Sequence, residues 1–174
     1  MPKPLGLPFD PIERAAELWR EHFGPSAAMA AATSVMRVQQ LLIASFDSIV
    51  GVHGLTFARY EALVLLTFSR TGALPLSKIG ERLMVHPTSV TNTIDRLEAA
   101  GLVRRLPNPR DGRGRLAQIT DRGREVVRLA TADLMAANFG MDGLDEGQLG
   151  EMFRLLRRLR VHAGDFAEDP VDNY

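Results

Sequence analysis

The chain has 174 residues, no cysteine and a formal net charge of zero, and 45% of its residues are hydrophobic and 24% charged. This length suits one domain with a substantial core, and the missing cysteines exclude disulfides, thiolate metal sites and thiol redox switches. The sequence shows neither a secretion signal nor a run of about 20 apolar residues that could cross a bilayer, so we expect a cytoplasmic protein without a membrane partner.

Three helices are expected before the middle of the chain. Asp10 followed by Pro11 is typical of a helix start, and Gly24 is typical of a helix end. Ser26 and Thr56 are expected to cap the next two helices. The three expected ranges are 11–23, 27–50 and 57–69.

The middle of the chain predicts shorter elements. Val90, Ile94 and Leu97 recur at i, i+4 and i+7, so a helix over 87–100 would bury one face. The elements around it are a compact helix over 76–83 and strand-like runs over 102–106 and 115–119, which would form a hairpin with a broad, Arg-bearing tip.

Two helices are expected at the end of the chain. Thr120 opens a helix over 121–138, and Asp145 with Gln148 has the capping-box spacing that opens a helix over 146–163. The N- and C-terminal helices together carry so much apolar surface that we expect an obligate dimer. The apolar residues concerned are Phe46, Leu129, Leu134, Phe153, Leu156 and Leu159.

The order helix, short helix, turn, helix and hairpin defines a winged helix-turn-helix. We therefore expect a mainly α fold with a small β-wing, plus a helical dimerisation region built from the N- and C-terminal helices. The expected ranges are 1–54 for the N-terminal dimerisation helices, 55–120 for the winged helix-turn-helix DNA-binding domain and 121–174 for the C-terminal dimerisation helices.

The distribution of charge points to a polyanion. Residues 77–128 hold 11 Lys and Arg against six Asp and Glu, so this stretch carries +5 and the remainder −5. A basic middle between acidic flanks is typical of a nucleic-acid-binding surface. A solvated charged surface is the alternative interpretation.

Small polar residues on the exposed face of helix 87–100 are candidates for contacts with DNA. Near a helix N-terminus they suit phosphates and base edges; Asn92 could pair with adenine, and Arg96 with guanine or phosphate. Arginines at the hairpin tip can enter a minor groove. The DNA-binding candidates are Thr88, Ser89, Thr91, Asn92, Arg96, Arg110, Arg113 and His86, which either caps the helix or contacts a phosphate.

The same residues resemble the MarR (multiple antibiotic resistance regulator) family. The resemblance rests on the run from Val85 to Gly101, then Leu102-Val103-Arg104-Arg105, Asp111-Gly112-Arg113 and Ile119-Thr120-Asp121-Arg122-Gly123. It implies a homodimeric repressor that binds a pseudo-palindromic promoter and is released by a small anionic ligand. It also implies that Arg113 reaches the minor groove and that Asp111 steadies the wing.

One branch of that family carries an extra N-terminal helix with a tryptophan and includes members that respond to urate. Trp19 in helix 11–23 resembles that feature, and Asp47 is similar to an acidic residue of that branch's ligand site. Thr93 stands where the resemblance calls for a ligand-linked arginine, so this chain departs from the branch, and we expect a related anion rather than urate.

A ligand pocket is expected beneath the DNA-binding domain, where the dimerisation helices meet helix 57–69. Its aromatic and ionisable residues suit a small anionic aromatic or purine-like effector. The candidates are Trp19, Arg37, Phe46, Asp47, Val50, His53, Arg59 and Tyr60. In the alternative interpretation Trp19, Phe46 and Val50 are core, Asp47 and Arg59 are surface or paired residues, and no ligand exists.

Enzymatic function finds no support in the sequence. It has no Gly-rich phosphate loop, no Gly-x-Ser-x-Gly and no His-Glu-x-x-His motif. The histidines lack the spacing of metal ligands, so we expect neither a metal nor a cofactor. The expected partners are double-stranded DNA, a second copy of the chain and a small ligand. The alternative function is a winged helix that contacts only other proteins.

Overall fold

The computed structural model describes residues 6–109 and 111–166, with the backbone alone for residues 111–113. The helices and strands in these ranges are α1 (Pro11–His22), α2 (Ala27–Gly51), α3 (Phe57–Phe68), β1 (Ala73–Pro75), α4 (Leu76–Leu83), α5 (Pro87–Ala99), β2 (Val103–Asn108), β3 (Asp111–Ile119), α6 (Asp121–Ala136), the 3₁₀-helix η1 (Asn138–Gly140) and α7 (Glu146–His162).

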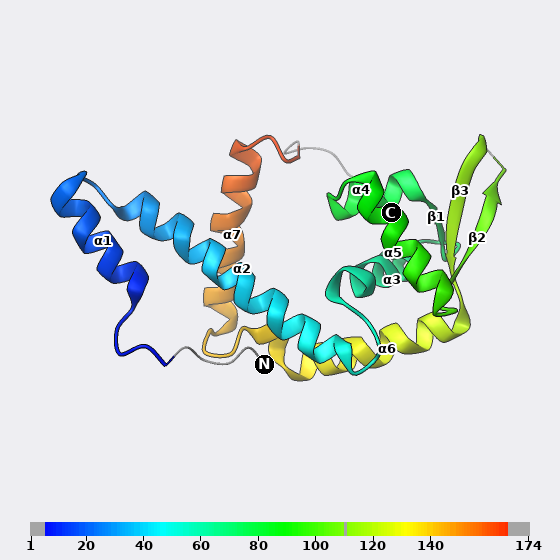
Figure 1. Ribbon diagram of the computed structural model, residues 1–174, viewed down its shortest axis with the longest axis horizontal. Helices are drawn as coiled ribbons and strands as arrows, with labels where there is room; N and C mark the ends of the chain where they lie inside the picture. The colour runs from blue at the N-terminus through cyan, green and yellow to red at the C-terminus, as the bar shows by residue number, and fades with distance from the viewer. Residues whose placement is uncertain (1–5, 110, 167–174) are drawn as a thin grey trace.

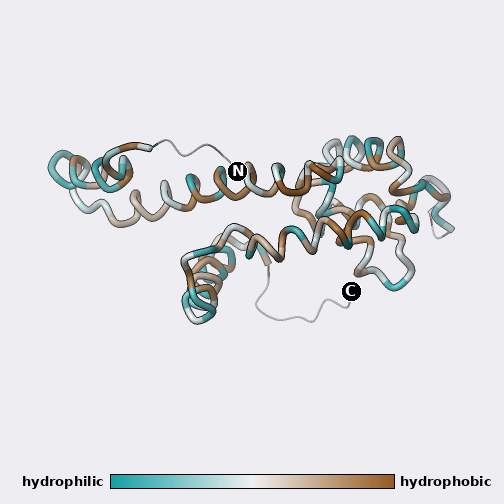
Figure 2. Tube along the Cα trace, turned by 90° about the horizontal axis from the view of Figure 1, so that it is seen from below, coloured by the Kyte–Doolittle hydropathy of each residue, from teal (hydrophilic) through white to brown (hydrophobic). Residues whose placement is uncertain are grey.

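A lobe formed by residues 57–119 contains α3, α4, α5 and the sheet, and the remaining helices extend away from it (Figure 1). The helices α1 and α2 lead away to one side, and α6 runs from the sheet along the lobe toward α2. The helix α7 rises from the far end of α6 (Figure 1), and Figure 2 shows it standing apart from α2. This architecture confirms the mainly α fold with a small β-wing and the winged helix-turn-helix.

The sheet has three antiparallel strands in the order β1-β3-β2. Val103 pairs with Ile119 and Leu106 with Leu116, and the register becomes irregular between Pro107 and Asn108, toward the tip of the wing. Strand β1, which pairs with β3, is missing from the sequence-based prediction. Its three residues end in Pro75 and are too few to show the alternation that predicts a strand.

The hydrophobic core lies in the lobe and continues into α2 and α6. The helix α3 is its centre, since Ala62, Leu63 and Leu66 are fully buried. Other buried members are Val90, Ile94 and Leu97 from α5, Phe46 and Val50 from α2, and Val127, Ala130 and Leu134 from α6. The core therefore crosses the expected boundaries after residues 54 and 120.

Two residues assigned to the dimer surface belong to this core instead. Phe46 and Leu134 are buried within one protomer, because α2 and α6 turn these side chains toward α3. Other members of that set remain exposed, with Phe153 at 60% and Leu159 at 63% of their full accessible area. The prediction that Phe46 and Leu134 need a second copy to cover them is wrong.

Local hydrogen bonds set where the last two helices begin. Asp145 and Gln148 form the predicted capping box. The Thr120 hydroxyl accepts from the backbone N–H of Gly123 and donates to the carbonyls of Gly101 and Leu102, in the turn between α5 and β2. A Cβ at position 123 would collide with the Leu102 carbonyl oxygen, so only glycine lets α6 start this close to the sheet.

Two predicted caps are wrong, and α6 ends earlier than predicted. The hydroxyls of Ser26 and Thr56 make no capping bond to α2 or α3. Asp47 of α2 takes the place of Thr56, because its Oδ1 accepts from the Phe57 N–H at 2.6 Å. The helix α6 stops at Ala136, and Phe139 in η1 has a left-handed backbone with φ of 48°.

The long helix α2 differs from the prediction that no segment could cross a membrane. It spans 25 residues with a mean hydropathy of 1.2 in its most apolar window, so by length and composition it could cross a membrane. The prediction that no segment reaches this threshold is therefore wrong. Figure 2 shows hydrophobic residues along much of α2. Its C-terminal part packs into the core, and its exposed apolar residues include Val35, Met36, Val38, Leu41 and Ile43.

Candidate nucleic-acid interface

The helices α4 and α5 form the helix-turn-helix. Met84 ends α4 in the left-handed conformation, with φ of 55° and ψ of 39°. The Val85 N–H then donates to the Gly80 carbonyl at 3.1 Å. A Cβ on Gly80 would lie 3.3 Å from both the Val85 carbonyl oxygen and the Val90 side chain. The turn therefore brings α5 close against α4 and fixes the direction in which α5 projects.

The structure places the five α5 candidates for DNA contact together on the exposed face of that helix. Val90, Ile94 and Leu97 turn inward and are buried. The outward residues, all exposed, are Thr88, Ser89, Thr91, Asn92 and Arg96. The first turn of α5 contains no acidic residue, so the positive end of the helix dipole is not neutralised there.

His86 caps α5. Its Nδ1 accepts a hydrogen bond from the Thr88 N–H at 3.3 Å, and its side chain is exposed. In the neutral ring the proton then resides on Nε2, which is left as a donor. Of the two predicted roles the structure supports capping, and the phosphate contact stays a prediction.

Most predicted wing contacts cannot be placed. Arg110 and the side chains of Asp111 and Arg113 lie outside the described residues. In the described part of the hairpin, the Arg104 Nε donates to the Gln118 amide oxygen at 2.7 Å, and Arg115 is exposed. These residues add positive charge to the wing beside α5.

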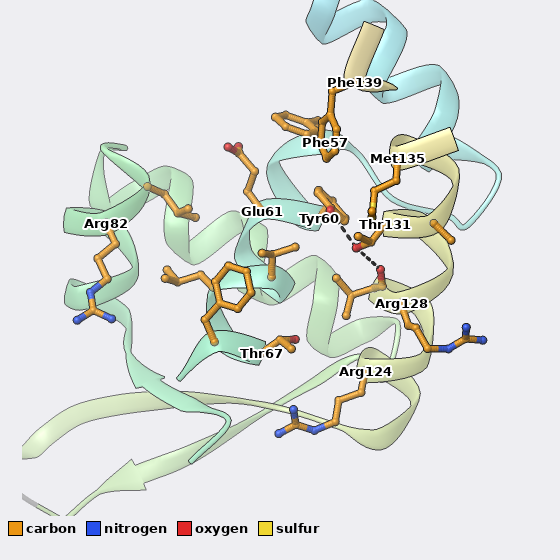
Figure 3. A pocket seen from close by; sticks show the side chains of 16 residues that line it. Phe57, Tyr60, Glu61, Thr67, Arg82, Arg124, Arg128, Thr131, Met135 and Phe139 are labelled. Atoms are coloured by element: carbon orange, nitrogen blue, oxygen red, sulfur yellow. Dashed lines mark hydrogen bonds between the residues drawn. The ribbon is translucent and has the colours of Figure 1, made fainter. Parts of the chain in front are cut away.

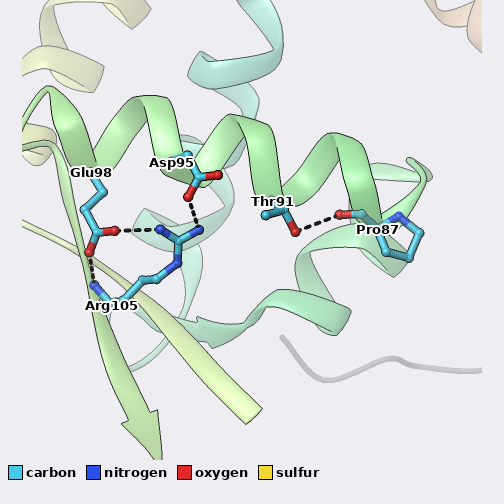
Figure 4. A network of polar contacts seen from close by, with 5 residues as sticks. All are labelled: Pro87, Thr91, Asp95, Glu98 and Arg105. Carbon is cyan, nitrogen blue, oxygen red and sulfur yellow. Dashed lines mark hydrogen bonds and ion pairs between the residues drawn. The ribbon is translucent and has the colours of Figure 1, made fainter. Parts of the chain in front are cut away.

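Arg105 joins the wing to α5 (Figure 4). Its guanidinium lies 2.7 Å from a carboxylate oxygen of Asp95 and 2.6 Å from one of Glu98, and its backbone N–H donates to Glu98 at 2.9 Å. The backbone hydrogen bond, followed by the side-chain bond, holds the pKa of Glu98 below its usual value. Arg105 thereby fixes β2 to α5 and offsets two negative charges near a surface suited to phosphates.

Sequence reasoning missed this role of Arg105. The available signal was the spacing of Asp95 and Glu98, which puts two carboxylates on one helix face shortly before an arginine-bearing strand.

The predicted ligand residues do not meet around one cavity. Trp19 lies on α1, far from the lobe (Figure 1), and its ring contacts Phe23 at a centroid distance of 5.0 Å. Arg37 donates to Gln40 within α2. Phe46 and Val50 are core residues, as the alternative interpretation has it, but its placement of Trp19 in the core is wrong, because Trp19 is 41% exposed.

Three other members of that set make structural contacts. Asp47 caps α3, Arg59 donates to the Gly54 carbonyl at 3.2 Å, and His53 Nε2 lies 2.7 Å from a carboxylate oxygen of Asp133 on α6. These contacts fix the junction of α2, α3 and α6. They leave Tyr60 as the one predicted residue that lines the large pocket of the described structure.

That pocket, of about 960 Å³, lies between α3, α4, α6 and η1 (Figure 3). Its wall is mainly apolar, and the Tyr60 hydroxyl in it is hydrogen-bonded to Thr131 at 3.0 Å. The residues that line it include Phe57, Tyr60, Glu61, Phe139, Arg124 and Arg128. The predicted ligand pocket, where the dimerisation helices meet α3, has most of its candidates on the α2 side of α3, whereas this pocket lies on the α6 side.

Comparisons with known proteins agree with this arrangement. Residues 58–114 match the sequence model of the MarR family. The uncharacterised HTH-type transcriptional regulator YkoM of Bacillus subtilis is 30% identical over 112 residues, which cover 64% of this chain and 71% of YkoM. The structure of Sco5413, a MarR family transcriptional regulator from Streptomyces coelicolor, is 64% identical; the match covers 81% of this chain and 98% of that one, with a TM-score of 0.75.

Two more distant structures share the fold. Sco3205, a MarR family transcriptional regulator from Streptomyces coelicolor solved in complex with DNA, is 24% identical with a TM-score of 0.71, over 77% of this chain and 86% of that one. CouR from Rhodococcus jostii RHA1, solved bound to p-coumaroyl-CoA, is 23% identical with a TM-score of 0.67, over 79% and 95% of the two chains.

Proposed function

Because the chain belongs to the MarR family of transcriptional regulators, we propose that it is a ligand-responsive repressor that binds a pseudo-palindromic operator as a cytoplasmic homodimer. Like its relatives, the protein is a DNA-binding regulator and not an enzyme. The observation that carries the proposal is the exposed polar face of α5, held against the basic wing by Arg105. The proposed contacts are Thr88, Ser89, Thr91, Asn92, Arg96 and His86, with Arg110 and Arg113 of the wing and with Asp111 as wing support.

Exposed apolar helix faces support the homodimer. The helix α7 has no buried residue, although Phe153, Leu155 and Leu159 are 60%, 54% and 63% exposed. The exposed apolar residues of α2 add to this surface. A second copy would cover both sets and would place two recognition helices in successive major grooves, roughly 34 Å apart.

The position of the large pocket supports a response to a ligand. The pocket lies where α6 leaves the lobe, so its occupant contacts both α6 and the α3–α4 face that carries the recognition helix. A ligand that prefers one separation of these elements shifts the population toward it. The neighbour CouR was solved with p-coumaroyl-CoA, which supports ligand binding by this fold.

Selection of duplexes from a random library by the full-length protein tests the DNA-binding part. We expect an inverted repeat of roughly 16–20 base pairs with half-sites about 10 base pairs apart. Affinity should fall steeply with rising salt, because Lys and Arg displace condensed counterions. Salt-insensitive binding without sequence preference would favour the protein-contact alternative.

Two substitutions separate base reading from phosphate binding in the same assay. Asn92→Ala should relax the selected sequence, at a cost of about 1–3 kcal/mol for one lost base contact. Arg113→Ala should weaken binding evenly across sequences. An unchanged selection profile in Asn92→Ala would remove this residue from base reading.

A further inference from the structure

We propose that the pocket between α3, α4, α6 and η1 binds an aromatic amine, with the ammonium group at the Glu61 carboxylate and the ring against Phe57, Tyr60 and Phe139 (Figure 3). The inference rests on the proposed ligand response and names the class of ligand. It differs from the anionic effector that the family resemblance implies, and the reason lies in which charged groups of the pocket already have partners.

Aromatic rings line one end of the pocket. Phe57 and Tyr60 on α3 have ring centroids 5.8 Å apart, and Phe46 links Phe57 to Phe139 of η1, at centroid distances of 4.6 and 6.0 Å. Glu61 follows Phe57 by four residues, so both side chains lie on the same face of α3. Figure 3 shows Glu61 near this aromatic end of the pocket. A cation beside a carboxylate and above aromatic faces is attracted by both.

The Glu61 carboxyl has no hydrogen bond or ion pair within residues 6–109 and 111–166. Burial raises the pKa of this carboxyl, with loss of solvation as the cause. The side chain stays exposed, so an ammonium group can reach it, and charge-assisted hydrogen bonds would replace the part of its solvation that the carboxylate has lost.

Two of the three arginines that line the pocket have partners elsewhere. Arg128 makes two hydrogen bonds to Glu125, at 2.9 and 2.7 Å. Arg82 has an interaction partner of its own, and the guanidinium of Arg124 packs beside the backbone of Gly72. Figure 3 shows all three guanidinium groups at the rim, away from Glu61. An anion at Arg82 or Arg128 would compete with the existing partner of that arginine, whereas an amine at Glu61 meets a carboxylate that has none.

Matched pairs of ligands that share a ring and differ in charge test the proposal. The probes are tryptamine with indole-3-acetate, and 2-phenylethylamine with phenylacetate, titrated calorimetrically into the full-length protein at pH 7. We expect each amine to bind at least about tenfold more tightly than its acid, which corresponds to about 1.4 kcal/mol. The volume of about 960 Å³ also predicts tighter binding by the larger indole.

Glu61→Gln keeps the shape of the side chain and removes its charge. We expect it to abolish the preference for amines, while Glu21→Gln, an exposed carboxylate on α1, leaves the preference unchanged. Thermal unfolding of both variants checks that they fold. Tighter binding of the acids, binding of neither amine, or an amine affinity unchanged in Glu61→Gln would overturn the assignment.

Operator binding is then measured with and without tryptamine. Weaker operator binding in the wild type and an unaffected operator affinity in Glu61→Gln support both proposals. Amine binding through Glu61 that leaves operator affinity unchanged supports the ligand class and overturns the ligand response. A ligand-free protein that binds no operator overturns the proposed function, whatever the ligand does.

Discussion

Glu98 and Glu61 are two carboxylates in opposite surroundings. Glu98 accepts from the backbone and guanidinium of Arg105, which lowers its pKa, whereas Glu61 loses water without gaining a donor, which raises its pKa. The Glu98 contribution to stability is therefore present above its unfolded pKa and is lost as pH falls through the lowered value. The ionised form of Glu61 has the opposite effect and destabilises the fold near neutral pH.

Glu61→Gln should consequently raise the midpoint of thermal unfolding at pH 7. The gain in the free energy of unfolding should stay below about 1 kcal/mol, because the carboxyl is partly exposed and solvent screens its charge. As pH falls through the raised pKa of Glu61, the wild-type carboxyl becomes neutral in the folded state and the difference from Glu61→Gln shrinks. Calorimetry of both proteins at pH 7 and at pH 4 measures this; a variant less stable at pH 7 would contradict it.

Few of these residue-scale contacts could be predicted from the sequence. Asp47 caps Phe57 across two helices, and Arg105 closes a contact between a strand and a helix, so both depend on tertiary packing. For His86 the sequence leaves two roles open, because a histidine before Pro87 suits either a cap or a phosphate contact. Residue type alone does not show on which side of α3 a ligand would lie: most candidates lie on α1 and α2, whereas the pocket is lined by α3, α4, α6 and η1.

The contact between α5 and β2 is the feature of greatest consequence for DNA binding at the scale of elements. Arg105→Met removes the guanidinium and leaves Asp95 and Glu98 uncompensated near the proposed DNA-binding surface. We expect operator affinity to fall by about tenfold or more, since both the wing position and the local charge change. Fluorescence anisotropy with a labelled operator measures the loss.

A second substitution separates charge from position. Adding Asp95→Asn and Glu98→Gln to Arg105→Met should restore part of the affinity if uncompensated charge is the main cause. The control is Arg128→Met, which removes one guanidinium from an exposed pair on α6. A loss as large in this control would show that total charge, rather than the contact between α5 and β2, sets the affinity.

The start of α6 makes a second prediction at this scale. Gly123→Ala should destabilise the protein by about 1–3 kcal/mol, because the added Cβ meets the Leu102 carbonyl oxygen and the Ile119 side chain. Gly51→Ala is the matched control, since its Cβ meets nothing within 4 Å. That variant should be neutral or more stable by up to about 1 kcal/mol. Urea unfolding of both proteins compares them, and equal effects would contradict the steric explanation.

The elements that could be predicted are those marked by patterns between residues close in sequence, such as apolar spacing and helix caps. The spacing of Val90, Ile94 and Leu97 and the capping box of Asp145 and Gln148 depend on neighbours in sequence, and both helices were found. Strand β1 is defined by its pairing with β3, and the end of α6 by left-handed residues in η1. Neither leaves a periodic pattern that sequence analysis could detect.

Exposed apolar helices determine the expected behaviour of the whole molecule. If α7 folds against a second copy, association and stability are linked, and the midpoint of thermal unfolding should rise with protein concentration. Phe153→Glu should lower the mass measured by sedimentation from dimer toward monomer. The control is Arg154→Glu, a substitution at the neighbouring exposed residue that should leave the measured mass unchanged. A monomeric wild type at micromolar concentration would contradict the dimeric arrangement.

The helix α6 is a single unbroken connection between the wing and the far helices. Thr120 attaches its start to the carbonyls of Gly101 and Leu102, and Asp133 near its end meets His53. Its 16 residues span about 24 Å, so it acts as a lever in which a rotation of about 5° at one end moves the other by about 2 Å. Opposed movements in two protomers would change the distance between the recognition helices by about 4 Å, more than the rise of one base pair, roughly 3.4 Å. A bound molecule that tilts α6 by a few degrees would therefore put the two half-sites out of register.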